Sequence, residues 1–401
     1  MEVLVLRRWM RNATENHHRK PLSRFQGYGR SRIRSSAAVV VVVAGLVIPA
    51  VSAVPSAAAP QPKPGQFVYV ANTQSDTVSV INAATNKVVA TIPVGRNPLE
   101  VALSPRRTRA YVTNQGTNSV SVIDTATNKV IATILVKDYP FGVAVSPRGT
   151  RLYVVNTASD VLSVIDTATN KVLTTIPVGD HPFRVAVSSR VPRAYVTNQD
   201  SDSVSVINTA TNKVIATIPV GRNPFGFGIS PNGTRAYVTN QVSNTVSVIS
   251  IATNKVIATI PVGDHPFRIA IASNGIYVYV TNLNTDSVSV ISTATNKVVA
   301  TIPVGRNPFG IAISPNCARA YVANLGADSV SVIDTAINEV VATITVGDEP
   351  FGVATGGGSS QSGTLLAKIR RSKGRPHPSG FSSRGQGQGW SDPPQSLRSR
   401  R

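Results

Sequence analysis

Short runs of alternating apolar and polar residues fill the chain from about residue 63 to residue 356. The stretch Arg222–Gly263 shows the pattern once, with FGFGIS, AYVTN, TVSVIS and KVIATIPVG separated by PNGT, QVSN and ATN. Val, Ile, Tyr and Thr at alternating positions, punctuated by Pro, Gly and Asn, are typical of strands and turns. The unit has no helical period and no helix cap. We therefore expect four antiparallel strands here, in an all-β domain.

The pattern recurs every 42 residues without insertion or deletion. The tyrosine of a YVxN tetrapeptide marks the seven copies at Tyr69, Tyr111, Tyr153, Tyr195, Tyr237, Tyr279 and Tyr321. Four strands in a unit of about 40–45 residues are the mark of a propeller blade. The sequence therefore predicts a seven-bladed β-propeller over residues 63–356.

The first strand of each unit has one bulky face and one minimal face. In PFGVAVS, for example, Phe141, Val143 and Val145 alternate with Gly, Ala and Ser. This fits the crowded position beside the channel, so we place KVIATIPV at the outer edge. The array begins at FVYVAN without a first strand and ends at PFGVAT (350–355) without a second. We expect the last strand to complete the first blade, because closure removes sheet edges that promote aggregation.

These seven in-register copies resemble the YVTN-repeat β-propeller family. The motif is YVTN in four units, YVAN at Tyr69 and Tyr321, and YVVN at Tyr153. The resemblance implies a seven-bladed propeller that is exported or displayed on the surface of a prokaryotic cell. It implies little about chemistry, because one fold hosts many functions.

The ends of the chain carry most of the formal net charge of +21. Residues 1–36 hold nine Lys or Arg against two Glu, and residues 357–401 hold nine against one Asp, which leaves +6 for the propeller segment. An apolar run, Ala37–Ile48, follows arginines and precedes small residues, as in a secretory signal peptide. Extended to Val54 it could instead stay as an N-terminal anchor. In both cases residues 37–59 direct the propeller out of the cytoplasm.

Residues 357–401 are rich in Gly, Ser, Gln, Pro and Arg, and we expect them to be disordered. Such a basic tail could bind polyanions, including nucleic acid, through counterion release. The propeller itself is a poor candidate for nucleic acid. The single cysteine, Cys317, stands in a turn where a sister unit has Gly, so it is expected to be a turn residue rather than a nucleophile.

Residues that differ between the copies are the candidates for a site. The position after the Phe of the first strand is Gly in four units but charged in three, and we expect it at the channel mouth, where a cluster of polar groups is a usual ligand site. The candidate ligand-binding residues are Glu100, Tyr139, His181, Arg184, His265 and Arg268. Two interpretations are open: the cluster binds a ligand, or the arginines pair with Glu100 or nearby aspartates and fill the mouth.

Other recurrent polar residues are expected to be structural. Asp202 and its equivalents should accept bonds from their own turn rather than bind calcium. The nearly alternating Arg96, Asp138, Asp180, Arg222, Asp264, Arg306 and Asp348 should form ion pairs between blades.

No catalytic motif, metal-ligand set or cofactor motif is found in the sequence, and no catalytic residue, metal or cofactor is assigned. The sequence favours an exported, monomeric, non-catalytic scaffold for a protein or envelope ligand. The rival hypotheses are a propeller lactonase or hydrolase with a site at the mouth, and polyanion binding through residues 357–401.

Overall fold

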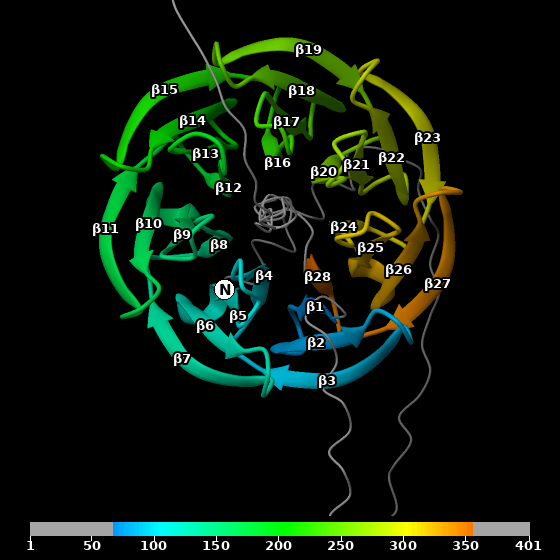
Figure 1. The fold of residues 1–401 in the computed structure, drawn as a ribbon, viewed down its shortest axis with the longest axis horizontal. Helices are drawn as coiled ribbons and strands as arrows, with labels where there is room; N and C mark the ends of the chain where they lie inside the picture. Colours follow the sequence, from blue (N-terminus) through cyan, green and yellow to red (C-terminus); the bar gives the residue numbers. More distant parts are fainter. Residues whose placement is uncertain (1–66, 356–401) are drawn as a thin grey trace, which may run out of the picture. The chain divides into compact units, whose positions relative to one another are not determined.

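Seven four-stranded antiparallel sheets are arranged as blades around a central axis (Figure 1). This computed structural model describes residues 67–355. The predictions for residues 1–36, 37–59 and 357–401 lie outside the described residues. Within 67–355, no helix has the length and apolar character that crossing a membrane would need. The predicted seven-bladed propeller with four strands per blade is confirmed.

Blade 1 combines three N-terminal strands with the last strand of the array, and the strands of blades 2 to 4 follow the chain in order. Blade 1 contains β1 (Phe67–Asn72), β2 (Thr77–Asn82), β3 (Lys87–Pro93) and the final strand β28 (Pro350–Thr355). Blade 2 contains β4 (Pro98–Leu103), β5 (Arg109–Asn114), β6 (Ser119–Asp124) and β7 (Lys129–Leu135). Blade 3 contains β8 (Pro140–Val145), β9 (Arg151–Asn156), β10 (Val161–Asp166) and β11 (Lys171–Pro177). Blade 4 contains β12 (Pro182–Val187), β13 (Arg193–Asn198), β14 (Ser203–Asn208) and β15 (Lys213–Pro219).

The other three blades repeat this order. Blade 5 contains β16 (Pro224–Ile229), β17 (Arg235–Asn240), β18 (Thr245–Ser250) and β19 (Lys255–Pro261). Blade 6 contains β20 (Pro266–Ile271), β21 (Tyr277–Asn282), β22 (Ser287–Ser292) and β23 (Lys297–Pro303). Blade 7 contains β24 (Pro308–Ile313), β25 (Arg319–Asn324), β26 (Ser329–Asp334) and β27 (Glu339–Thr345). Short 3-10 turns lie at Gln115–Thr117 (η1), Thr157–Ser159 (η2) and Leu325–Ala327 (η3).

Blade 1 is built from both ends of the repeat array. The inner strand β28 pairs antiparallel with β1, with Tyr69 opposite Ala354 and Val70 opposite Val353. Figure 1 shows β28 beside β1, where the two ends of the coloured chain meet. The predicted closure of the ring is therefore confirmed.

Position along each blade determines burial as the sequence predicted. The inner strand β8 is buried throughout, whereas the outer strand β7 exposes most of its residues. The outer strands leave β-branched side chains about half in solvent, such as Ile131 and Ile257, each 52% exposed. Core residues from neighbouring blades pack together between the sheets, as Val122 of β6 does with Val143 of β8.

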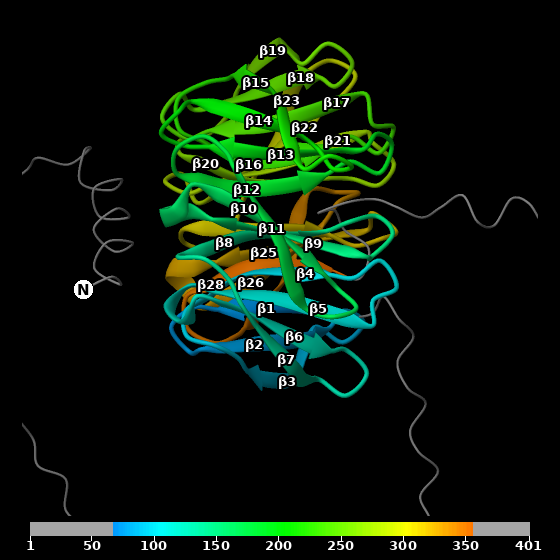
Figure 2. The ribbon, with the colours of Figure 1, turned by 90° about the vertical axis from the view of Figure 1, so that its left-hand side faces the viewer.

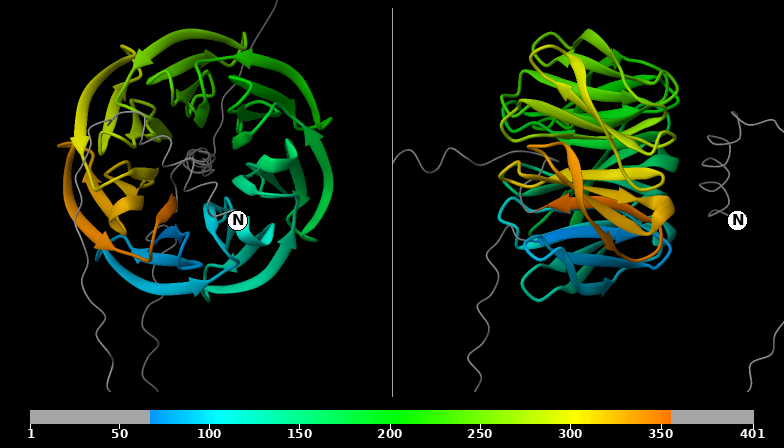
Figure 3. Two further views of the ribbon diagram at one scale, coloured as in Figure 1. Left: turned by 180° about the vertical axis from the view of Figure 1, so that it is seen from behind. Right: turned by 90° about the vertical axis from the view of Figure 1, so that its right-hand side faces the viewer.

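The connections between strands form two opposite rims, which the edge-on views separate (Figures 2 and 3). The turns after the first and third strands of each blade form one face, which we call the turn rim. The loops after the second and fourth strands form the other, the loop rim. Hydrogen bonds within each rim agree with this division: Thr125 N donates to Thr108 O at 3.2 Å on the turn rim, and Gln115 N donates to Asn97 O at 3.0 Å on the loop rim.

The Asn of the recurring YVxN tetrapeptide packs where one blade is connected to the next. Its Asn is fully buried and donates from the side-chain amide to a serine seven residues later, as Asn240 does to Ser247 at 2.9 Å. The blade-linking Gly221 packs against this amide, since a Cβ there would lie 2.6 Å from Asn240 Cγ. The tetrapeptide is thus part of the structural framework.

The Thr of the motif connects neighbouring inner strands. Thr197 Oγ1 accepts the backbone N–H of Arg184 in its own blade and donates to the carbonyl of Phe225 in the next blade, at 3.1 and 2.9 Å. The equivalent inter-blade bonds run from Thr113 to Phe141, Thr239 to Phe267 and Thr281 to Phe309. Three units have Ala71, Val155 or Ala323 instead, so three of the seven joints lack this hydroxyl.

Exchanging Thr and Val at two joints should therefore have opposite effects. Thr197→Val leaves a buried carbonyl and N–H without a partner, and we expect a loss of about 1–3 kcal/mol in the free energy of unfolding. Val155→Thr should instead gain about 1 kcal/mol by adding a second threonine bond between blades 3 and 4, beside the one from Thr157 to the Pro182 carbonyl. Urea unfolding of both variants measures the two changes. Destabilisation by both substitutions would show that packing, rather than the hydroxyl, determines stability at these joints.

The seven motif tyrosines are almost completely buried, and burial raises the pKa of every one. For Tyr69, burial together with the Asp124 carboxylate raises the pKa to about 12. Burial, together with the nearby Tyr277 and Cys317 side chains, also raises the pKa of Tyr279 to about 12. These side chains stay neutral in the folded state well above the pH at which an unfolded chain would ionise them.

Stability should consequently fall as the pH rises from about 10 towards 12. In this window the unfolded chain loses tyrosine protons that the folded protein keeps, so the free energy of unfolding decreases with pH. Tyr69 and Tyr279 each account for about 2 kcal/mol at pH 12, relative to neutral pH. Urea unfolding across this range, with phenolate absorbance followed in parallel, measures the slope. A Tyr69→Phe, Tyr279→Phe variant should show a shallower slope, and an unchanged slope would contradict the assignment.

Candidate functional site

A β-bulge near the start of each inner strand turns two consecutive side chains towards the channel. In β12, Pro182 lies opposite Asn198 and Arg184 opposite Thr197, so Phe183 is the extra residue. A bulge interrupts the alternation of side chains and can re-aim them. The aromatic residue and the residue after it can therefore both face the axis.

The bulged residue of each inner strand, Phe in six blades and Leu in blade 2, closes the channel near the loop rim. One buried cluster contains Leu99, Phe141, Phe183, Phe225, Phe267, Phe309 and Phe351, one from each blade. Rings of alternate blades also touch, with centroids 5.5 Å apart for Phe141 and Phe225 and 5.4 Å for Phe141 and Phe351. Since non-adjacent blades meet only across the axis, these side chains fill it.

Glu100, Arg184 and Arg268 come together in the same channel. They belong to the inner strands of blades 2, 4 and 6, and Glu100 forms an ion pair with each arginine. The exposed fractions of the three side chains are only 3%, 14% and 5% respectively. The ion-paired arrangement is the one that the sequence allowed as an alternative to ligand binding. A ligand-binding role for these residues stays a prediction.

Glycines in the neighbouring blades make room for these pairs. A Cβ on Gly142, Gly226 or Gly352 would lie 2.4–2.5 Å from the carbonyl oxygen of the residue before Arg184, Arg268 or Glu100. Each charged residue thus follows a blade whose glycine lets the next inner strand approach closely. A Cβ on Gly310 would likewise clash with the carbonyl oxygen of Phe351, and the residue after Phe351 is Gly352. These glycines are therefore needed for packing whether or not a charged residue follows in the next blade.

The cluster carries excess positive charge. Burial lowers the pKa of the Arg184 guanidinium to about 10 and that of Arg268 to about 9, so both stay protonated at neutral pH. Two guanidinium groups therefore face the single carboxylate of Glu100. Arg268 also lies over the Phe225 ring, 6.0 Å from its centroid, in a cation–π contact. Its Nε and Nη1 are buried without a hydrogen-bond partner among residues 67–355.

The remaining candidates lie on the loop rim rather than in the cluster. Tyr139, His181 and His265 all have positive φ, 56°, 50° and 53°, at a turn position that Asn occupies in three other blades. His181 Nδ1 lies 3.0 Å from an Asp200 carboxylate oxygen, and its ring stacks on Phe183. His265 Nδ1 lies 3.2 Å from the Asn284 amide nitrogen. The two histidines occupy blade junctions separated by two whole blades, blades 4 and 5.

Two expectations for the loop rim need correction. Asp202 does not accept a bond from its own turn: its Oδ1 accepts the backbone N–H of Asn223, at 2.7 Å, and six other loops repeat this link. The expected ion pairs of the alternating Arg and Asp residues are not formed among the described residues. Arg96 and Arg306 instead donate to the backbone carbonyls of Gly116 and Gly326 on the same rim.

Cys317 occupies a left-handed turn position, with φ 57°, where Gly149 and Gly233 have φ 75° and 72°. Its Sγ lies 2.9 Å from Ser273 Oγ. The expected role as a turn residue agrees with this geometry. Among residues 67–355, no three His, Cys, Asp or Glu side chains are grouped so as to hold a metal ion.

The fold and channel define the class of protein as a seven-bladed β-propeller. Residues 227–348 match the family model described as "Lactonase, 7-bladed beta-propeller". This match covers less than half of the chain, so it is a similarity to that family. No curated protein matches the sequence.

Solved structures share the fold at low sequence identity. A functionally unknown protein from Desulfotomaculum acetoxidans aligns with a TM-score of 0.66 and 16% identity, over 72% of this chain and 98% of that one. Hydrazine synthase from Kuenenia stuttgartiensis aligns with a TM-score of 0.63 and 23% identity, over 71% and 100%. The dihydro-heme d1 dehydrogenase NirN, in complex with DHE, gives 0.60 and 16%, over 76% and 78%.

Proposed function

We propose that this protein is an exported, non-catalytic β-propeller that acts as a binding scaffold at the cell surface or in the envelope. The observation that carries the proposal is the filled channel. Seven apolar side chains meet at its axis, and Glu100 is paired with both channel arginines. A small-molecule site needs a concave pocket with polar groups that are free to meet a ligand.

The outer surface offers contacts for a partner instead. The fourth strand of every blade leaves aliphatic side chains exposed, including Val89, Ile131, Leu173 and Ile215. Extended apolar surface on a soluble domain commonly marks an interaction site. Export is supported by the apolar run 37–48 with its preceding arginines.

Fractionation of cells that express the full chain tests the location and the partner together. We expect the protein in the envelope or medium, with its propeller accessible to protease added to intact cells. Cross-linking in the envelope followed by mass spectrometry should then capture one recurrent partner. A protein confined to the cytoplasm would overturn the proposal.

A lactonase-type hydrolase is the second candidate, because the family match and the unpartnered Arg268 nitrogens both favour it. Purified protein can be assayed against a panel of five- and six-membered lactones, alongside metal analysis. If the protein is a non-catalytic scaffold, we expect the lactones to be hydrolysed no faster than in buffer without protein. A faster rate that Arg184→Gln abolishes, while circular dichroism shows an intact fold, would establish the enzyme instead.

A further inference from the structure

Opposite charges are segregated between the two rims of the propeller. The turn rim holds nine Arg and six Lys against three Asp and one Glu, a balance of +11. The loop rim holds three Arg and one Lys against ten Asp and one Glu, a balance of −7. The net charge of residues 67–355 is only +5, because the two rims largely cancel. The domain therefore has a strong charge dipole along its axis, with the turn rim positive and the loop rim negative.

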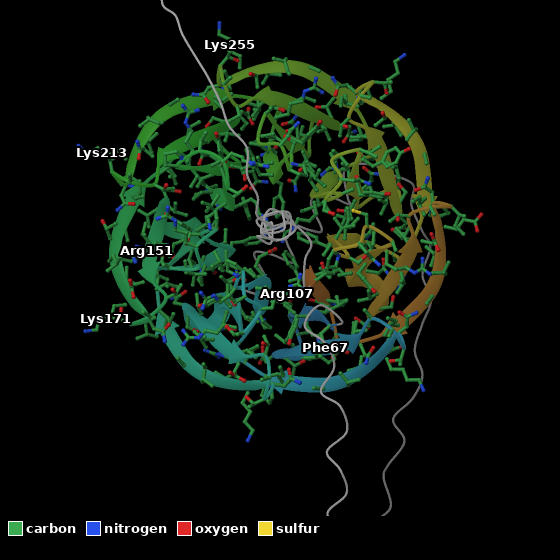
Figure 4. The ribbon with its side chains drawn as sticks, viewed as in Figure 1. Phe67, Arg107, Arg151, Lys171, Lys213 and Lys255 are labelled. Carbon is green, nitrogen blue, oxygen red and sulfur yellow. The ribbon has the colours of Figure 1, made fainter. Side chains whose placement is uncertain are left out.

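Many charges on the turn rim are free to meet a partner. Arg106, Arg148 and Arg190 are exposed at the same turn position in blades 2, 3 and 4, where blades 5 to 7 have Asn. Six exposed lysines start the outer strands of six blades: Lys87, Lys129, Lys171, Lys213, Lys255 and Lys297. Figure 4 shows Lys171, Lys213 and Lys255 projecting at the perimeter.

Other charges on this rim are already engaged within the fold. Arg109, Arg193 and Arg235 each donate to a backbone carbonyl in the next blade, at 2.8–3.0 Å. Asp166 accepts bonds from its own turn and pairs with Arg151, and those bonds hold the pKa of its carboxyl below the usual value. Counted without these five residues, the turn rim still has eleven basic against three acidic side chains, a balance of +8.

The turn rim is also level. Every unit has 42 residues, so no turn carries an insertion that would rise above its neighbours. A broad, level face with dispersed positive charge suits a flat anionic surface better than a groove-bound single chain. Basic residues near a membrane with anionic lipids are attracted to it within about one Debye length.

The chain enters and leaves the propeller on this same side. Strand β1 begins at Phe67 and β28 ends at Thr355, both on the turn rim. Twelve residues separate the candidate apolar segment, which ends at Val54, from β1. Twelve residues reach at most about 40 Å. A retained segment would therefore hold the turn rim, rather than the loop rim, near the membrane.

We propose that the turn rim is a docking face for a membrane surface that bears anionic lipids. This inference rests on the proposed function, because it names the surface on which the exported scaffold sits. The attraction is electrostatic, so binding should weaken steeply as salt is added. The acidic loop rim would then face away from the membrane, towards other partners.

Lysine acetylation of the full chain tests which face docks. The protein is mixed with phosphatidylcholine vesicles, with or without phosphatidylglycerol, and labelling is read by mass spectrometry. We expect the six turn-rim lysines to be protected only by the anionic vesicles, while Lys137 on the loop rim stays labelled. Equal protection by neutral vesicles, or equal protection of Lys137, would overturn the inference.

A charge-matched pair of variants isolates the rim. Arg106→Ser, Arg148→Ser, Arg190→Ser removes three charges from the turn rim, and Arg96→Ser, Arg222→Ser, Arg306→Ser removes three from the loop rim. The first should weaken anionic-vesicle binding by about 100-fold at low salt, and the second should leave it unchanged or slightly stronger. Equal effects would mean that net charge, rather than the rim, controls binding.

Soluble polyphosphate serves as a competitor that separates a lipid surface from a free polyanion. Binding to polyphosphate in preference to vesicles would overturn the lipid assignment. An exported, catalytically inert protein without lysine protection would overturn the inference and leave the proposed function intact. Protection of the turn-rim lysines in a protein that hydrolyses lactones would instead support the docking face and overturn the non-catalytic scaffold.

Discussion

Replacing Glu100 by Gln is expected to lower the free energy of unfolding by about 3–5 kcal/mol, because two buried guanidinium groups would lose their common partner. The isosteric amide keeps the packing of the channel and removes only the negative charge. Chemical denaturation of the variant measures the loss. Glu339→Gln, on an exposed outer strand, is the matched control and should change stability by less than about 0.5 kcal/mol.

Removing the whole cluster should restore much of that stability. A triple variant, Glu100→Met, Arg184→Met, Arg268→Met, takes both signs of charge out of the channel, and replacing buried ion pairs by apolar residues is often neutral or stabilising. If Glu100→Gln and the triple variant are equally unstable, the loss would come from packing rather than from unpaired charge. If Glu100→Gln is as stable as the native chain, the ion pairs contribute nothing measurable.

A chain that ends at Glu349 should lose the closed ring. It lacks β28, whose Phe351 and Ala354 are buried and whose backbone pairs with β1. We expect several kcal/mol of destabilisation from lost apolar burial and hydrogen bonds, together with aggregation through the freed edge of β1. Light scattering after gel filtration and thermal unfolding measure both effects.

A chain that ends at Gly356 is the control for this truncation, because it keeps β28 and removes only the residues that follow. It should remain monomeric and as stable as the full chain. If the chain ending at Glu349 is also soluble, monomeric and equally stable, closure by β28 does not hold the ring together.

The sequence predicted the fold well because its period and turn chemistry act locally. The Asn of ATNK, for instance, stands in a predicted turn, and Asn128, Asn212 and Asn254 have left-handed φ of 53–54°. Assignment of the inner and outer strands followed from residue size alone, since one face of the inner strand carries mostly Gly, Ala and Ser. None of these conclusions needed knowledge of contacts between blades.

Contacts between blades were harder to predict. Asp202 was expected to bond within its own turn, but its carboxylate accepts the backbone N–H of Asn223, 21 residues later. The filling of the axis by Phe residues depends on the ring radius, which no local pattern reveals. Pairing of Arg184 and Arg268 with Glu100 was one of two open interpretations, because sequence alone does not place blades 2, 4 and 6 around one channel.

Some signals were present in the sequence and were missed. The hydroxyl of Thr197 joins two blades, and its recurrence in four units could have suggested a shared bond. The charge segregation of the rims also follows from which turns carry Lys and Arg and which carry Asp. Total charge concealed it, because the two rims nearly cancel.

The distribution of the inter-blade threonines has a consequence for how the ring opens. The motif threonine is replaced by Ala323 and Ala71 at the two joints that flank blade 1, whereas three consecutive joints from blade 4 to blade 7 have it. Single threonines outside the motif join blade 1 to its neighbours instead, with Thr73 donating to the Pro98 carbonyl and Thr355 to the Ile313 carbonyl. Blade 1 is also the blade assembled from the two ends of the array. Partial unfolding under native conditions should therefore begin at blade 1, and blades 4 to 7 should behave as one cooperative unit that exchanges its amide hydrogens last.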